Sequence, residues 1–177
     1  MSRKVILYIG TSLDGYIARK NGEVDWLEGD GSNPTDEGDY EAFYKTIDTV
    51  IMGNATYVQI MGWGEYPYKG TKGYVYTREV KEANEDVIFT NENPKLLIER
   101  LKKESGKDIW IVGGCELLDL FMKEDLIDEY IIAVAPVILG EGIPLFKEGN
   151  AEVKLCLKES KIFNGFVQNH YIRKVNN

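Results

Sequence analysis

Residues 109–122 read IWIVGGCELLDLFM, and they combine an apolar run, a glycine pair and a second apolar segment. The run Ile109–Val112 is apolar throughout, which is typical of a β-strand covered on both faces. Gly113 and Gly114 follow that run, and the residues from about Cys115 to Met122 predict a helix. A strand that passes through glycine into a helix is the repeating unit of an α/β sheet.

The same unit occurs earlier in the chain, where the buried strand TVIM at 49–52 is followed by Gly53-Asn54 and a short helix from Ala55 to about Met61. Apolar, β-favouring runs predict three more strands, and polar caps with regularly spaced apolar residues predict two more helices. The strands are expected at Lys4–Ile9, Tyr74–Thr77 and Val87–Phe89, and the helices from Thr35 or Asp36 to about Ile47 and from Pro94, capped by Asn93, to before Gly106.

From Glu129 onwards the pattern predicts strands only. Tyr130–Pro136 is apolar, whereas residues 153–158 alternate between apolar and polar side chains, which indicates a half-exposed strand. Asn164-Gly165 then predicts a tight hairpin turn into a last strand at Phe166–Arg173. The sequence therefore predicts a single domain over residues 1–177 with a three-layer α/β fold. Its central sheet is expected to be mostly parallel, with an antiparallel C-terminal hairpin.

Composition excludes several classes of function. The chain of 177 residues carries 21 Lys and Arg against 29 Asp and Glu, a net charge of −8, and no basic cluster, which argues against nucleic-acid binding. Two distant cysteines, Cys115 and Cys156, and one histidine cannot form a zinc site, so no metal is expected. No apolar run is long enough for a membrane span or an export signal, which predicts a cytoplasmic protein without a membrane partner.

The two glycine turns are the first candidates for a binding site. In an open α/β sheet, ligands collect at the carboxyl ends of the strands, where glycine lets a phosphate approach the backbone and the amides of the next helix bind it. Gly53-Asn54 and Gly113-Gly114 both stand at such a position. A tight turn that needs glycine only for packing is the alternative for either motif alone.

Five segments together resemble the dihydrofolate reductase superfamily. They are similar to its branch that contains the reductase (RibD C-terminal) domain of bacterial riboflavin-biosynthesis enzymes, and they extend over nearly the whole chain. The resemblance implies a dihydrofolate-reductase-like fold. The segments are SLDGYIA at 12–18, MGNATY at 52–57, YTRE at 76–79, IVGGCELLDLF at 111–121 and APVILGEGIPLF at 135–146.

The resemblance further implies that NADPH is the cofactor. Gly53, Asn54 and Thr56 match the turn that holds the cofactor pyrophosphate, although the family often has arginine where this chain has Asn54. Thr77 and Arg78 match the position that contacts the adenosine 2′-phosphate, and a guanidinium with a hydroxyl suits that dianion. Gly113 and Gly114 match a glycine pair whose joining peptide is typically cis, and Cys115, Glu116 and Leu117 begin the helix whose amides face the cofactor.

Catalytic and substrate-binding residues are less sharply indicated. Asp39 lies near the position of the superfamily's proton-donating carboxylate, and Asp14 belongs to the S-x-D-G match. The alternatives are a helix-start acid for Asp39 and a turn residue for Asp14. Aromatic side chains in the loop after Met61, namely Trp63, Tyr66 and Tyr68, could wall a flat heterocyclic substrate or pack the loop.

The resemblance implies an NADPH-dependent reductase similar to 5-amino-6-(5-phosphoribosylamino)uracil reductase of riboflavin biosynthesis. In that reaction a hydride reduces the ribose C1′ of the phosphoribosylamino-pyrimidine, with a protein group or water as proton donor. A reductase of dihydrofolate or another pterin is a second hypothesis, and a nucleotide-binding scaffold without turnover is a third. A homodimer formed through edge strands is also implied.

Overall fold

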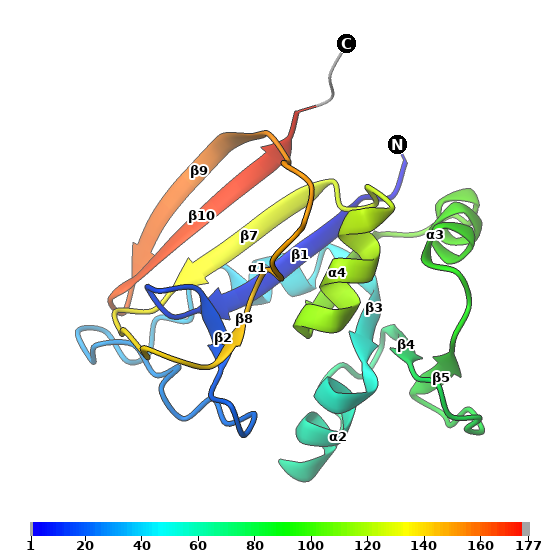
Figure 1. Ribbon diagram of the computed structural model, residues 1–177, viewed down its shortest axis with the longest axis horizontal. Coiled ribbons are helices and arrows are strands. Elements are labelled where there is room, and N and C mark those ends of the chain that lie inside the picture. The colour runs from blue at the N-terminus through cyan, green and yellow to red at the C-terminus, as the bar shows by residue number, and fades with distance from the viewer. Residues whose placement is uncertain (1, 175–177) are drawn as a thin grey trace.

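A computed structural model describes residues 2–174 of the chain (Figure 1). Helices lie among the strands up to α4, and only strands follow, as the sequence predicts. The strands are β1 (Val5–Thr11), β2 (Tyr16–Ala18), β3 (Ile47–Gly53), β4 (Lys72–Tyr76), β5 (Val87–Thr90), β6 (Asp108–Gly113), β7 (Glu129–Val134), β8 (Ile143–Pro144), β9 (Leu155–Phe163) and β10 (Phe166–Arg173). The helices are α1 (Tyr40–Tyr44), α2 (Asn54–Gly62), α3 (Pro94–Lys103) and α4 (Cys115–Lys123).

Eight strands form one sheet in the order β5-β4-β3-β6-β1-β7-β10-β9. The six strands from β5 to β7 are parallel, whereas β10 runs antiparallel to both β7 and β9. Asn164 and Gly165 both have positive φ in the turn between β9 and β10, which confirms the expected hairpin turn. The small second sheet of β2 and β8 was not expected, because neither segment has a strand-like pattern.

The helices cover both faces of the sheet. The connections through α1 and α2 move toward the β5 edge of the sheet, and those through α3 and α4 run back in the other direction. Because each crossover is right-handed, crossovers that run in opposite directions place their helices on opposite faces of the sheet. Figure 1 shows α4 in front of the sheet and α1 behind it. One core cluster contains Leu97, Leu117 and Phe121 from α3 and α4, and a second contains Phe43 and Ile60 from α1 and α2. The three-layer α/β fold is thereby confirmed.

Helix α1 is much shorter than the sequence indicates. It begins at Tyr40, after Asp39, instead of at Thr35 or Asp36. Gly38 has a φ of +62°, and a methyl group on it would lie 2.8 Å from the ring of Phe163 on β9, so the chain before Asp39 leaves the helical conformation. All the helices are short, and within residues 2–174 none is long and apolar enough to cross a lipid bilayer.

Strand β9 differs from the half-exposed strand that the sequence predicts. It forms one edge of the sheet, and its residues from Cys156 to Ile162 are exposed on both faces. The helices of this protein pack over the middle of the sheet, and they leave both faces of β9 uncovered along this stretch. Strand β9 therefore presents apolar side chains, among them Leu157 and Ile162, on the surface of the protein.

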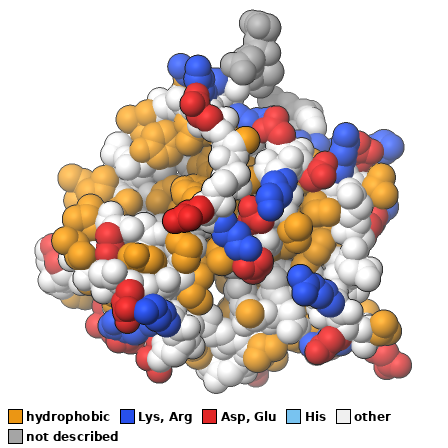
Figure 2. All heavy atoms as spheres, in the orientation of Figure 1, with side chains coloured by type: hydrophobic (Ala, Val, Ile, Leu, Met, Phe, Trp, Pro, Cys, Tyr) orange, Lys and Arg blue, Asp and Glu red, His pale blue; other side chains and the backbone are white. Residues whose placement is uncertain are grey.

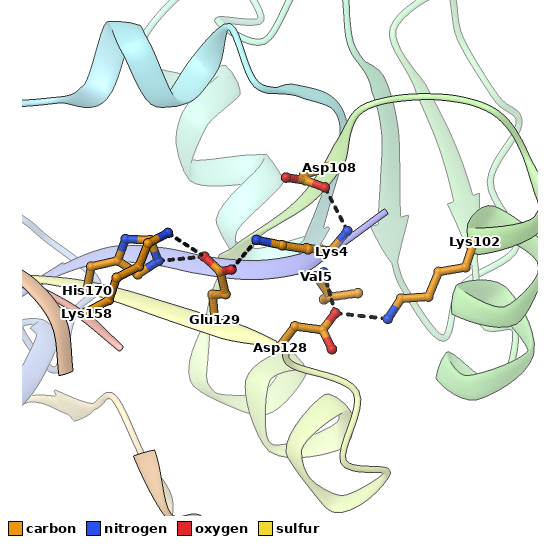
Figure 3. Close-up of polar contacts among 8 residues, drawn as sticks. All are labelled: Lys4, Val5, Lys102, Asp108, Asp128, Glu129, Lys158 and His170. Atoms are coloured by element: carbon orange, nitrogen blue, oxygen red, sulfur yellow. Dashed lines mark hydrogen bonds and ion pairs between the residues drawn. The ribbon is translucent and has the colours of Figure 1, made fainter. Parts of the chain in front are cut away.

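A buried carboxylate joins four strands at the amino ends of the parallel strands (Figure 3). Glu129, the first residue of β7, has a side chain that is 5% exposed. Its two oxygens lie 2.6 Å from Lys4 Nζ, just before β1, and 2.6 Å from His170 Nε2 on β10, and Lys158 of β9 lies 4.0 Å away. His170, the one histidine of the sequence, thus pairs at the end of the sheet opposite the glycine turns.

Candidate functional site

The two glycine turns lie side by side at the carboxyl edge of the sheet. Strands β3 and β6 are parallel neighbours, so Gly53 and Gly113 end at the same edge. A methyl group placed on Gly53 would lie 3.9 Å from the Gly113 carbonyl oxygen and the Gly114 nitrogen. One placed on Gly114 would lie 3.5 Å from the Thr56 hydroxyl. We call the surface formed by Gly53, Thr56, Gly113 and Gly114 the glycine cradle; four of the residues expected to bind the cofactor meet in it.

Both helices that leave the cradle begin without a side-chain cap. Gly53 is the N-cap residue of α2 and Gly114 that of α4, and neither can supply a capping side chain. Because the first amides of a helix have no partner within the helix, an anion is stabilised there. The peptide bond between Gly113 and Gly114 is cis, as the resemblance implies. Two uncapped helix starts beside glycine backbone fit the pyrophosphate of a dinucleotide.

The first three residues of α4 have different environments. Leu117 is buried in the core beneath the cradle, and its Cβ would lie 3.9 Å from a methyl group on Gly53. Glu116 accepts a hydrogen bond from Lys147 Nζ at 2.5 Å, which ties the start of α4 to the segment after β8. Burial raises the pKa of the Cys115 thiol, so this cysteine stays protonated and suits packing rather than nucleophilic chemistry.

Thr77 and Arg78 follow β4 at the same edge of the sheet. The Thr77 amide donates to the carbonyl of Thr90, and its hydroxyl accepts from the amide of Glu79 at 3.1 Å, which fixes the turn after β4. Arg78 is exposed, and no carboxylate in residues 2–174 forms an ion pair with it. Its guanidinium is therefore available to a ligand anion.

Lys81 is a neighbour of this region that sequence reasoning missed. Its ammonium donates to the side-chain oxygen of Asn54, the first residue of α2, at 2.9 Å. The contact joins residues 27 positions apart, and the sequence around Lys81 has no pattern that distinguishes it from other surface lysines. Only the folding of residues 77–86 back onto α2 reveals it.

Asp14 fastens two loops together. Its carboxylate accepts hydrogen bonds from the Ser12 hydroxyl at 2.6 Å and from the backbone amides of Leu139 and Gly140 at 3.1 and 2.7 Å. The Ser12 hydrogen bond, with smaller contributions from the two amides, lowers the pKa of Asp14. The group is therefore ionised at neutral pH, which favours the turn interpretation of Asp14 over that of a proton donor.

Asp39 does not reach the glycine cradle through its contacts. Its carboxylate accepts from Lys161 Nζ at 2.5 Å, and Lys161 lies on β9. Strand β9 is four positions from β6 in the sheet, roughly 19 Å at the usual strand spacing. Asp39 and Lys161 line a cavity of about 210 Å³ on that side of the molecule, together with Gly38, Phe163 and other residues.

The aromatic residues after α2 separate into two groups. Trp63 is 65% exposed and lines a cavity of about 360 Å³ with Gln59 and residues 23–25. Tyr66 and Tyr68 are buried in the core on the α1 and α2 face of the sheet. The Tyr66 hydroxyl lies 2.7 Å from the position of a methyl group on Gly73, near the amino end of β4. The expectation that Tyr66 walls the substrate site is thus corrected to a packing role, and Trp63 remains the aromatic candidate.

The sequence matches the family model described as the RibD C-terminal domain over residues 3–167. It is 48% identical to the uncharacterized protein YwjB of Bacillus subtilis (strain 168), over 98% of this chain and 99% of YwjB. The fold is similar to a crystal structure from Shewanella sp. PV-4 of a protein assigned to riboflavin biosynthesis, with a TM-score of 0.87, 30% identity, and coverage of 99% of this chain and 100% of that one. It also matches Acinetobacter baumannii RibD with a TM-score of 0.74 at 18% identity, over 98% of this chain and 58% of that one.

Proposed function

Because the chain belongs to the RibD C-terminal domain family, we propose that it is a reductase that uses NADPH to reduce a small heterocyclic substrate. The family is reductase-related, and its members include domains of riboflavin-biosynthesis enzymes. The substrate to test first is the phosphoribosylamino-pyrimidine that 5-amino-6-(5-phosphoribosylamino)uracil reductase reduces.

The observation that carries this proposal is the glycine cradle. Two strand–helix turns from adjacent parallel strands leave a side-chain-free backbone surface, with the Thr56 hydroxyl beside it and two uncapped helix starts behind it. The pyrophosphate would lie against Gly53 and Gly114, and the adenosine 2′-phosphate against Thr77 and Arg78. NADPH supplies a hydride when bound, and the protein supplies the position of the reacting groups.

The loops fastened by Asp14 have a part in excluding water. Leu13 and Ile138 lie on these two loops, and their apolar side chains are 64% and 70% exposed. The Leu13 amide donates to the Val137 carbonyl at 2.8 Å, so a backbone hydrogen bond also joins the two loops. A substrate that covers these side chains would displace water from the carboxyl edge of the sheet. With Asp14 ionised and Asp39 paired to Lys161, we assign the proton donor to water.

The proposal is tested by titrating the purified protein with NADPH and with NADH while nicotinamide fluorescence is followed. We expect saturable binding of NADPH, and NADPH oxidation with the phosphoribosylamino-pyrimidine. Turnover with a dihydropterin instead would favour the pterin reductase. Binding without turnover on either substrate would favour a scaffold, and no binding of either nucleotide at millimolar concentration would contradict the proposal.

Arg78→Ala is expected to weaken NADPH binding by about tenfold and to leave NADH binding unchanged, because the two nucleotides differ only in the 2′-phosphate. The measurement is the pair of dissociation constants, with Arg19→Ala as control, since Arg19 forms a bidentate pair with Asp25 outside the proposed phosphate sites. Equal weakening of both nucleotides would contradict the assignment of Arg78 to the 2′-phosphate.

We also propose that two copies of the chain associate through β9. On the paired strands β9 and β10, Ile162 lies opposite Val167, and Leu157 lies opposite Tyr171. The register shifts by one residue between these two pairs, so both pairs have their side chains on the α4 face of the sheet. Ile162, Leu157 and Val167 are 80%, 58% and 40% exposed. Figure 2 shows hydrophobic side chains gathered over β9 and β10 on this face. An apolar surface on an unpaired edge strand suits association with a second copy.

Ile162→Glu is therefore expected to shift the protein from dimer to monomer, because a charge would be buried in the interface. Light scattering coupled to size-exclusion chromatography measures the mass. Leu96→Glu on α3 serves as control, because Leu96 is 58% exposed and lies on a different element. A wild-type mass of one chain at micromolar concentration would contradict the dimer.

A further inference from the structure

The first residue of α2, Asn54, is a neutral side chain, and the structure brings a cation to the same place. Lys81 Nζ lies 2.9 Å from Asn54 Oδ1. Asn54 is a neutral acceptor, so it orients the ammonium without neutralising it. A positive charge thus reaches the start of α2 from the loop that follows β4.

Several contacts hold Lys81 in this position. Its side chain is only 31% exposed, and its ammonium lies 5.5 Å from the centre of the Phe89 ring on β5. Farther along the same loop, Asn84 donates to the Tyr57 hydroxyl at 3.2 Å, which fastens the loop to α2 a second time. The ammonium is therefore placed by the fold and does not sample the surface freely.

Lys81 also retains capacity for a ligand. An ammonium has three donors, and one is directed at Asn54. Glu79 lies 3.3 Å away, but its side chain is 73% exposed and the attraction is screened by water. A phosphate dianion beside the ammonium and Arg78 would interact more strongly than one exposed carboxylate.

We propose that Lys81 binds the 2′-phosphate of NADPH together with Arg78, and that this pair sets the preference for NADPH over NADH. The inference rests on the proposed function, because it concerns the nucleotide of the same site. Lys81 follows Thr77 and Arg78 on one loop and returns to the start of α2, so its ammonium lies between the segment proposed for the 2′-phosphate and the helix start proposed for the pyrophosphate. In a chain of net charge −8, two cations on one loop, with only the exposed Glu79 carboxylate beside Lys81, are a local exception.

The test compares dissociation constants for NADPH and NADH in the wild type, Lys81→Met and the double variant Lys81→Met/Asn54→Arg. We expect Lys81→Met to bind NADPH about tenfold more weakly, with NADH within about twofold of the wild type. Asn54→Arg in the same background should restore most of the NADPH affinity, because it returns the charge to α2. Lys72→Met is the matched control, since Lys72 also lies over an aromatic ring, 5.4 Å from Tyr74, but at the start of β4.

A second measurement removes the nicotinamide from the experiment. Calorimetric titration with adenosine 2′,5′-bisphosphate and with adenosine 5′-monophosphate isolates the 2′-phosphate, and only the first ligand should lose affinity in Lys81→Met. Equal losses for both ligands, or an unchanged NADPH to NADH ratio, would overturn the assignment of Lys81 while the reductase proposal stands. Failure of the wild type to bind either dinucleotide would overturn both. Unchanged melting temperatures show that the variants are folded.

Discussion

Gly114→Val is expected to lower NADPH affinity at least about a hundredfold while the protein remains folded. Gly114 has φ −85° and ψ −161°, an extended conformation that other residues adopt. A Cβ there would lie 3.5 Å from the Thr56 hydroxyl, which is ordinary van der Waals contact. The two further methyl groups of valine would occupy the cradle, where the phosphate must approach the backbone. Nicotinamide fluorescence titration measures the loss.

Gly113→Ala provides the contrast. Gly113 has a φ of +128°, which strains any other residue, and a methyl group there would lie 3.3 Å from Ile9 Cδ1. This variant is expected to lose thermal stability, whereas Gly114→Val should keep most of it. A Gly114→Val protein that binds NADPH like the wild type would show that the glycine cradle is not the cofactor site.

The cradle could be predicted from sequence because each of its parts is local. Gly53 and Gly113 each follow an uninterrupted apolar run and precede a helix, so three consecutive segments of chain define each turn. That the turns adjoin follows from the sheet order, in which β3 and β6 are neighbours although about 60 residues separate them. The alternation of strands and helices in the sequence predicts the class of fold, but it does not predict which strands are neighbours in the sheet.

The features that sequence reasoning missed depend on contacts between distant segments. Helix α1 begins only after Gly38, which packs closely against the ring of Phe163, 125 positions further along the chain. The sequence predicts that Asp14 is a catalytic or a turn residue, but it does not predict the hydrogen bonds that Asp14 accepts from the amides of Leu139 and Gly140, on a distant loop. Tyr66 lies in a glycine-rich loop, but its ring enters the core because β4 leaves space at Gly73. No local pattern encodes such partners.

Glu129→Gln is expected to lower the free energy of unfolding by about 2 kcal/mol at neutral pH. Removing one partner from a buried ionic group typically costs 3–5 kcal/mol, and the cost is reduced here because Lys4 and Lys158 are about half exposed and regain water. For a chain of this length the melting temperature should fall by roughly 4–8 °C. Glutamine keeps the shape of the side chain but has only one acceptor oxygen, so the change removes the charge and one of the two hydrogen bonds that Glu129 accepts from Lys4 and His170 (Figure 3).

The pH dependence gives this prediction a definite sign. Burial alone would raise the pKa of Glu129, but hydrogen bonds from Lys4 and His170 outweigh it and lower the pKa from its ordinary value of 4.5. A carboxylate whose pKa is lowered in the folded state stabilises the fold at pH values above its pKa in the unfolded chain. It loses that effect as the pH falls through its pKa in the folded state. The difference in stability between wild type and Glu129→Gln should therefore be full at pH 7 and shrink below about pH 4.5.

Glu41→Gln is the control for this variant, because the Glu41 and Lys45 side chains of the α1 region are 81% and 71% exposed and their pair should contribute nothing measurable. A melting temperature for Glu129→Gln equal to that of the control would refute a stabilising role for the buried carboxylate. Glu129 lies at the amino edge of the sheet and the cradle at the carboxyl edge, so NADPH affinity should not change in Glu129→Gln. Glu129→Gln is then expected to lose stability and keep NADPH affinity, whereas Gly114→Val is expected to lose NADPH affinity and keep its stability. The two ends of the sheet would thereby have separate roles.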